Sequence, residues 1–199
     1  DHIRVPNMAC MEVFQELAGM VATDGPLARA FVEQPRRHLL ADLLGCLAAA
    51  PVFNEAHIQA LVAVALMDAA AELGGYEVVL EQHVPYSDGA SRGRADVVVY
   101  SLRDGKRVPS CVIELKAGKR NTKQAAANLL QLHNEACEKQ VVRYAAALAV
   151  ENPDVKAFVA TVAYEPDDQV GHGERMFVDE VDWKQKQQAH AAVSGHTLE

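Results

Sequence analysis

The sequence lacks the segments by which membrane and secreted proteins are recognised. None of its apolar runs reaches the roughly 18 residues that a membrane-spanning helix needs. The first ten residues, DHIRVPNMAC, do not show the basic-then-apolar pattern of a signal peptide. We therefore expect no membrane partner. The expected location is intracellular and cytoplasmic, or nuclear or inside a host cell if the protein is an effector.

Metal and nucleophile motifs are also scarce. The four cysteines form no Cys-x-x-Cys pair, so we expect four buried thiols rather than a disulfide framework or a zinc cluster: Cys10, Cys46, Cys111 and Cys137. The eight histidines show neither His-x-x-x-His nor His-Glu-x-x-His spacing, which argues against a zinc enzyme. No Gly-x-Ser-x-Gly elbow and no Walker loop occurs, so neither a serine hydrolase nor an ATPase is indicated.

The charge is unevenly distributed along the 199 residues. Half of the residues are apolar and 23% are charged, as in a globular domain. The net charge of −8 argues against a generic nucleic-acid coat. Residues 92–123, however, contain nine Lys or Arg and three Asp or Glu, a net of +6, which leaves −14 for the rest. This segment is either a phosphate-binding face or a solvated hairpin, and charge alone does not decide between them.

Helical periodicity and turn signals divide the chain into two regions. Residues 8–22 and 25–50 have apolar residues at helical spacing, interrupted at Pro35 and ended at Pro51. We expect residues 1–51 to be a helical extension without chemistry of its own. It would pack on the following domain or form the interface of a homodimer or of a partner protein.

The second region, residues 52–199, is predicted to be an α/β (α+β) domain. Its expected elements are a helix at 54–75, strands at 76–85, 93–102 and 108–118, a long helix at 123–151 that is continuous or kinked near 133–134, strands at 155–165 and 174–182, and a helix at 183–193. Asp104-Gly105 indicates a hairpin. The first three strands should form an antiparallel meander and the fourth should run parallel to a neighbour, which gives a mixed sheet.

Three charged residues interrupt strands that are otherwise apolar. Glu114 and Lys116 are two residues apart, so they should project from the same face of their strand, and Asp96 on the adjacent strand should reach the same place. Two carboxylates that converge in a half-buried site must either share a proton or bind a cation, and Mg²⁺ fits oxygen ligands of this kind. The alternative is a structural Glu–Lys pair beside an unrelated hairpin aspartate.

The order of these motifs resembles the PD-(D/E)XK nuclease superfamily. Asp96 followed by "ELK" at 114–116 matches the superfamily motif, although Ala95 stands where the motif has proline. Gln140 and Tyr144 in "EKQVVRYAAAL" match the Gln-x-x-x-Tyr motif of the RecB-like and lambda-exonuclease-like branch. The sequence is also similar to a nuclease domain at the end of certain prokaryotic AAA-ATPase-like proteins. Over residues 52–165 the resemblance implies a restriction-endonuclease-like αβββαβ core.

The resemblance also implies roles for individual residues. Asp96 and Glu114 would bind Mg²⁺ or Mn²⁺ together with the Leu115 carbonyl. Glu55 would hold a second ion or a metal-bound water, and Lys116 would orient the attacking water and neutralise charge on the phosphate.

Further residues of the resemblance concern the surroundings of the metal and the substrate. Gln140 would hydrogen-bond near Lys116, and Tyr144 with Arg143 or Lys139 would contact the DNA backbone. The DNA strand would also run along a set of basic residues: Arg92, Arg94, Lys119, Arg120 and Lys123.

The expected function is that of a Mg²⁺- or Mn²⁺-dependent deoxyribonuclease, an endonuclease acting as a toxin or effector, in defence, or in recombination. As in the family it resembles, cleavage would leave 5′-phosphates. The alternative is a catalytically silent nuclease-like fold that binds nucleic acid or a protein partner.

Overall fold

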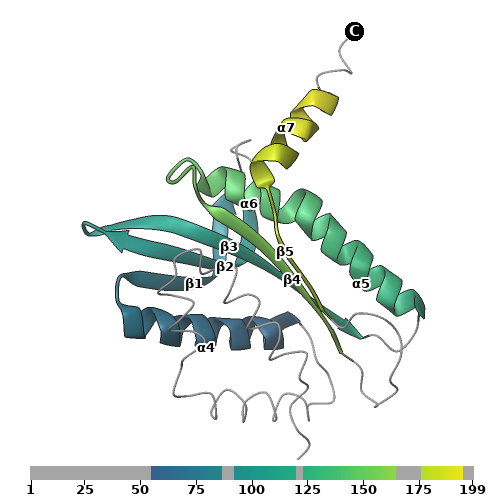
Figure 1. The fold of residues 1–199 in the computed structure, drawn as a ribbon, viewed down its shortest axis with the longest axis horizontal. Coiled ribbons are helices and arrows are strands. Elements are labelled where there is room, and N and C mark those ends of the chain that lie inside the picture. Colours follow the sequence, from purple (N-terminus) through teal and green to yellow (C-terminus); the bar gives the residue numbers. More distant parts are fainter. Residues whose placement is uncertain (1–54, 87–91, 120–122, 165–175, 195–199) are drawn as a thin grey trace, which may run out of the picture.

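A five-stranded mixed sheet with helices on both faces forms the framework of the protein (Figure 1). The computed structural model describes residues 55–86, 92–119, 123–164 and 176–194. The helical extension predicted at residues 1–51 lies outside the described residues. The mixed α/β architecture predicted from the sequence is confirmed at this level.

The strands follow one another across the sheet in sequence order. Three of them form an antiparallel meander: β1 (Tyr76–Pro85), β2 (Arg92–Arg103) and β3 (Lys106–Lys119). After the helical segment, β4 (Lys156–Tyr164) pairs parallel to β3, and β5 (Met176–Glu180) pairs antiparallel to β4 at the edge. The predicted meander and the predicted parallel fourth strand are both confirmed. A helical crossover explains the parallel pairing, because it returns the chain to the end from which β3 began.

Local sequence explains the sharp turns. Asp104 and Gly105 join β2 to β3 with positive φ angles of 50° and 74°, as a two-residue hairpin turn requires. The first helix, α4 (Glu55–Leu73), ends at two glycines with φ angles of 66° and 76°. The N–H of Gly74 donates to the Ala70 carbonyl at 3.0 Å, which closes the helix. The N-cap predicted at Asn54 lies outside the described residues.

The long helical segment between β3 and β4 changes its winding once. It consists of α5 (Lys123–Glu135), the π-helical stretch η1 (Ala136–Gln140) and α6 (Val141–Leu148). The sequence predicts one helix or two with a kink near residues 133–134; the irregularity instead begins at Ala136. A π-helical stretch is uncommon and often accompanies a functional site. The last helix is α7 (Trp183–Ser194).

The central strands are buried on both faces. Six consecutive residues of β2, from Ala95 to Tyr100, are at most 8% exposed. One face packs against α6 through a core cluster that includes Val98, Val112 and Val141. The alternate residues point to the face covered by α4, because successive strand side chains point in opposite directions. Asp96 therefore lies inside an otherwise apolar, fully covered strand.

Two of the cysteines can be compared with the prediction. Cys111 and Cys137 are buried free thiols, as expected, whereas Cys10 and Cys46 lie outside the described residues.

Candidate active site

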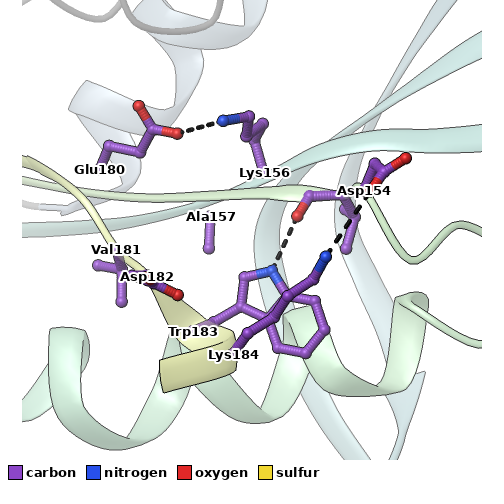
Figure 2. Close-up of a pocket in the computed structure, with 9 residues that line it drawn as sticks. Asp154, Lys156, Ala157, Glu180, Val181, Asp182, Trp183 and Lys184 are labelled. Atoms are coloured by element: carbon purple, nitrogen blue, oxygen red, sulfur yellow. Dashed lines mark hydrogen bonds and ion pairs between the residues drawn. The ribbon is translucent and has the colours of Figure 1, made fainter. Parts of the chain in front are cut away.

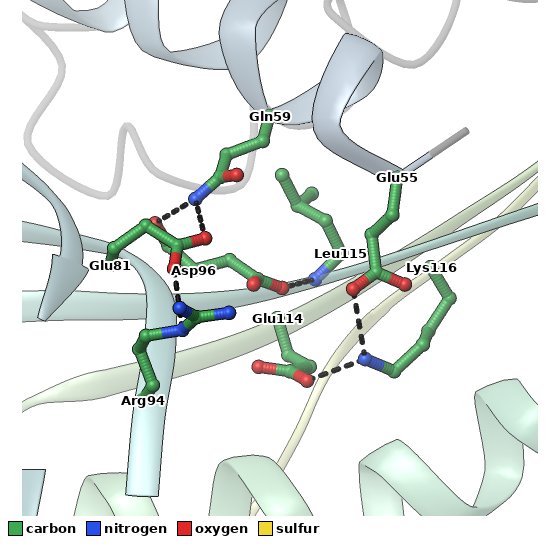
Figure 3. A network of polar contacts seen from close by, with 8 residues as sticks. All are labelled: Glu55, Gln59, Glu81, Arg94, Asp96, Glu114, Leu115 and Lys116. Atoms are coloured by element: carbon green, nitrogen blue, oxygen red, sulfur yellow. Dashed lines mark hydrogen bonds and ion pairs between the residues drawn. The ribbon is translucent and has the colours of Figure 1, made fainter. Parts of the chain in front are cut away.

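Asp96 lies where β2 and β3 cease to pair. The last paired positions of the two strands towards this end are Val97 and Ile113, so Asp96 and Glu114 follow directly after them. The N–H of Leu115 donates to Asp96 Oδ2 at 2.7 Å (Figure 3). The carboxylate thus accepts a backbone hydrogen bond at the end of the ladder, and this bond holds it between the two strands.

Glu114 and Lys116 project from β3 on the face that α5 and α6 cover. They share this face with Val112, which belongs to the core cluster beneath α6. Lys116 Nζ donates to Glu114 Oε1 at 2.6 Å and lies 3.7 Å from Glu55 Oε1. Glu55 begins α4 and reaches the lysine from there (Figure 3). The structure therefore gathers the predicted acids around the predicted lysine.

The burial of these carboxyl groups changes their acidity. Glu114 is 3% exposed, and its pKa is raised to about 7, first by burial and then by the negative charge of Asp96; the ammonium of Lys116 acts in the opposite direction. The pKa of Asp96 is also raised by burial, against the hydrogen bond from Leu115 and the charge of Lys116. Removing both carboxylates from water is unfavourable unless a cation compensates for it.

Lys116 remains positively charged in these surroundings. Burial lowers its pKa, but the charge of Glu114 and its hydrogen bond, together with Glu55 and Asp96, outweigh burial, so the net shift is upward. The side chain is 14% exposed. In the metal-free protein, Lys116 is therefore an ammonium group that donates hydrogen bonds.

The site contains carboxylate oxygens that could serve as ligands of a cation. Among the residues that the structure describes, Glu114 Oε2 is the one buried side-chain oxygen or nitrogen with no hydrogen-bond partner. An unpartnered buried carboxylate oxygen is costly, and a hard divalent cation would satisfy it. Asp96, Glu114 and Glu55 supply oxygens only, as Mg²⁺ and Mn²⁺ prefer. The residues therefore fit such an ion. Leu115 contacts the site through its N–H, and the role predicted for its carbonyl stays a prediction.

Two residues of the site, Gln59 and Glu81, were not predicted from the sequence. Gln59 Nε2 donates to Glu81 Oε1 at 2.8 Å and to the Asp96 carbonyl at 3.0 Å (Figure 3). Gln59 lies one helical turn after Glu55, on the same side of α4, and this spacing is the signal that could have revealed it.

Glu81 has an unusual backbone conformation. It has a φ of 53° inside β1, between Leu80 and Gln82, which pair with Val97 and Ala95 on either side of Asp96. Its carboxylate forms an ion pair with Arg94. A non-glycine residue at positive φ costs about 1–3 kcal/mol, and such strain is concentrated at functional sites. Strand alternation alone cannot reveal it.

The Gln-x-x-x-Tyr pair is divided between solvent and core. Gln140 is exposed and, among the described residues, forms no hydrogen bond with Lys116. Tyr144 is 5% exposed, and burial, followed by the charge of Glu114, raises its pKa. Its ring stacks on Tyr86 with centroids 6.0 Å apart and an angle of 15° between the planes.

The stacked rings of Tyr86 and Tyr144 leave no space for a side chain at Gly93. A Cβ there would lie 2.1 Å from Tyr86 Oη and 2.3 Å from Tyr144 Cε1, so only glycine fits beneath the stack.

The predicted DNA-contacting residues are found at several places around the site. Four of them have exposed side chains: Arg92, Arg94, Lys139 and Arg143. Arg94 pairs with Glu81, and the Arg143 guanidinium lies 5.8 Å from the centroid of the Tyr86 ring. Lys119 ends β3 and Lys123 begins α5, whereas Arg120 lies outside the described residues.

A pocket of about 560 Å³ lies elsewhere, where the start of β4 meets the turn between β5 and α7 (Figure 2). Four of its five charged residues pair with each other, Lys156 with Glu180 at 2.7 Å and Lys184 with Asp154 at 3.6 Å. The fifth, Asp182, accepts a hydrogen bond from the Gln185 N–H at 3.0 Å. The indole of Trp183 donates to the Val155 carbonyl at 2.8 Å. With these polar groups already satisfied by one another, the pocket offers less chemistry than the carboxylate site.

Comparisons with other proteins do not assign a family. No protein-family model and no curated protein sequence matches the chain. Within the described residues, no helix is both long enough and apolar enough to cross a membrane. The geometry and charge of the site are therefore what bears on function.

Proposed function

We propose that the protein is a Mg²⁺- or Mn²⁺-dependent nuclease of the PD-(D/E)XK type, which hydrolyses phosphodiester bonds of DNA. The observation that supports this most is the convergence of Asp96, Glu114 and Lys116, in which Lys116 bonds Glu114 Oε1 and leaves the buried Oε2 without a hydrogen-bond partner. The element order of α4, the β1–β3 meander, the α5–α6 segment and β4 agrees with the αβββαβ core of the restriction-endonuclease-like fold.

The burial of two neighbouring carboxyl groups is unfavourable for the fold unless they share a proton or bind a cation. A structural Glu–Lys pair would satisfy both partners, but here one oxygen of Glu114 is left over, and a second buried carboxylate lies beside it. Asp96 and Glu114 would hold the ion, and the half-buried Glu55 would bind a water or a second ion. The ion would polarise the phosphate and make a bound water more acidic.

Lys116 has the properties required of the charged group beside a scissile phosphate. Its pKa is raised in the metal-free protein by Glu114, Glu55 and Asp96, and its ammonium donates to Glu114 Oε1 at 2.6 Å. Its ammonium can orient the attacking water and stabilise the negative charge that develops as the P–O bond breaks. Asp96 is held by the Leu115 N–H and Lys116 by Glu114 Oε1, so the carboxylate and the ammonium are positioned before substrate binds.

The substrate backbone would be held by the exposed basic residues. Arg92, Lys139 and Arg143 are exposed, whereas Arg94 is engaged by Glu81. Phosphate contacts of this kind are independent of base sequence and weaken as salt concentration rises. We therefore expect cleavage without strong sequence preference and with a steep dependence on ionic strength.

The test is a plasmid and linear-DNA cleavage assay in Mg²⁺, Mn²⁺ or EDTA. The wild type should cut only with metal, and Lys116→Ala should lower the rate by at least about a hundredfold, the scale seen when one group that stabilises developing charge is removed. Lys156→Ala, which removes an exposed lysine paired with Glu180, is the matched control and should cut like wild type. Cleavage by Lys116→Ala at the wild-type rate would contradict the proposal. DNA retardation by the wild type without cutting in either metal would instead identify a binding module.

A further inference from the structure

A second group of potential ligands lies apart from the carboxylate site. His133 of α5, Cys137 of η1 and Asp179 of β5 each offer one atom, and these atoms lie within 4.8 Å of one another. His133 Nε2 is 2.7 Å from Asp179 Oδ2 and 3.6 Å from Cys137 Sγ. A thiol and a carboxylate therefore converge on the same ring nitrogen, from elements far apart in the sequence.

The distance between the nitrogen and sulfur atoms is close to that of a tetrahedral metal site. Zinc binds imidazole nitrogen at about 2.0–2.1 Å and thiolate sulfur at about 2.3 Å, so two such ligands at the tetrahedral angle are about 3.5 Å apart. The observed Nε2–Sγ separation of 3.6 Å agrees with this value. The Asp179 oxygen would have to withdraw from Nε2 by about 0.6 Å. It can do so because its side chain is 64% exposed and belongs to the edge strand.

The other nitrogen of the imidazole is held as metal ligands usually are. His133 is 1% exposed, and its Nδ1 lies 2.9 Å from Thr161 Oγ1. Without a metal, the 2.7 Å contact with the Asp179 carboxylate requires the proton on Nε2, and the Thr161 hydroxyl donates to Nδ1. Metal binding would transfer the proton to Nδ1, which would then donate to Thr161 Oγ1 and leave the Nε2 lone pair for the ion. A partner of this kind fixes both the tautomer and the ring orientation of ligating histidines. Thr161 is itself fully buried on β4, so the ring is anchored in the core.

We propose that His133, Cys137 and Asp179 bind a transition-metal ion of the Zn²⁺ class, with a solvent molecule as fourth ligand on the exposed side of Asp179. The combination of nitrogen, sulfur and oxygen suits Zn²⁺, whereas Mg²⁺ takes oxygen ligands only. The site is distinct from the carboxylate site and does not depend on the proposed nuclease function.

The ion would have a structural effect. It would tie β5, the edge strand, to the junction of α5 and η1. The third ligand lies on β5, far along the chain from the other two, so the sequence shows only the His133-x-x-x-Cys137 spacing. That spacing places two ligands on one helical face but is too common to identify a site by itself.

The experiment is a titration of the metal-free full chain with Co²⁺, which reports thiolate ligation by a charge-transfer band in the near ultraviolet. We expect one Co²⁺ per chain with this band, and displacement of the cobalt by Zn²⁺, which binds such sites more tightly. Cys137→Ala should abolish the band, and Asp179→Ala should weaken binding about tenfold or more. Because the Asp179 side chain is 64% exposed, its variant opens no cavity in the core, and Asp179→Asn, which keeps a hydrogen-bond acceptor beside His133 Nε2, shows whether a loss of binding is due to the lost ligand.

Two controls separate this site from the rest of the molecule. Cys111→Ala removes the other buried thiol among the described residues and should leave the band intact. Glu114→Gln should also leave it intact, because Glu114 belongs to the carboxylate site. The proposal is overturned if the wild type shows no thiolate band, if Cys137→Ala retains it, or if Asp179→Ala binds cobalt as tightly as wild type.

Discussion

Replacing Glu114 by glutamine should make the metal-free protein more stable at neutral and alkaline pH while it abolishes cleavage. Glu114 is buried, and its pKa is raised from 4.5 to about 7 in the folded protein. A raised carboxyl pKa means that folding favours the protonated form. The stability from this group is complete below about pH 4.5 and is lost as the pH rises through about 7. Glutamine has the same shape but cannot ionise.

The magnitude follows from the size of the pKa change. The step from 4.5 to about 7 corresponds to roughly 3 kcal/mol, because one pH unit is about 1.4 kcal/mol. The attraction of Lys116 at 2.6 Å is already contained in this figure, which is an upper limit because relaxation and water entry around the ionised group lower the penalty. Lys116 keeps a second partner in Glu55, 3.7 Å away. We therefore expect a net gain of about 1–2 kcal/mol above pH 7.

The assay is urea denaturation of wild type and Glu114→Gln in EDTA between pH 5 and 8.5. The wild type should lose stability relative to the variant as the pH rises to about 7, and the difference should then level off. Adding Mg²⁺ at pH 8 should stabilise only the wild type. Glu180→Gln, which alters an exposed glutamate paired with Lys156, is the control and should follow wild type. Parallel stability curves for wild type and Glu114→Gln over this range would refute the reasoning.

Two further predictions concern the backbone around the site. Gly93→Ala should lower the free energy of unfolding by about 1–3 kcal/mol, because the new Cβ would overlap the rings of Tyr86 and Tyr144. Thermal denaturation measures this effect. An unchanged melting temperature would show that the aromatic stack can move. Glu81→Gly should be more stable than Glu81→Ala by about 1 kcal/mol, since both lose the contacts with Gln59 and Arg94 but only glycine relieves the positive φ. Equal denaturation midpoints for the two Glu81 variants would show that the strand carries no strain there.

Much of the fold was accessible from the sequence because its causes are local. The alternation in β1, the turn at Asp104-Gly105 and the glycines after α4 each depend on neighbours within a few residues. The meander then follows from a short hairpin, and the parallel fourth strand follows from a helical crossover. The change to π-helical winding at Ala136 was not accessible, because the stretch ACEKQ contains no glycine or proline that would mark it.

The candidate site was accessible only in part. The spacing of Glu114 and Lys116 places both on one face of a strand whatever the rest of the chain does. The place of Asp96 depends instead on where β2 and β3 separate and on the Leu115 N–H that holds its carboxylate. The acidity of Glu114 depends on burial, which one strand read alone does not reveal.

The sequence by itself determined which chemistry was available: two acids and a lysine set into apolar strands, with basic residues around them. Only the tertiary structure decided which groups meet. It brought Gln59 and Glu81 to the carboxylate site, and it brought Asp179 to His133 and Cys137. The physical reason is that periodicity sets the direction of a side chain on its own element, whereas its partners depend on how distant elements register and pack.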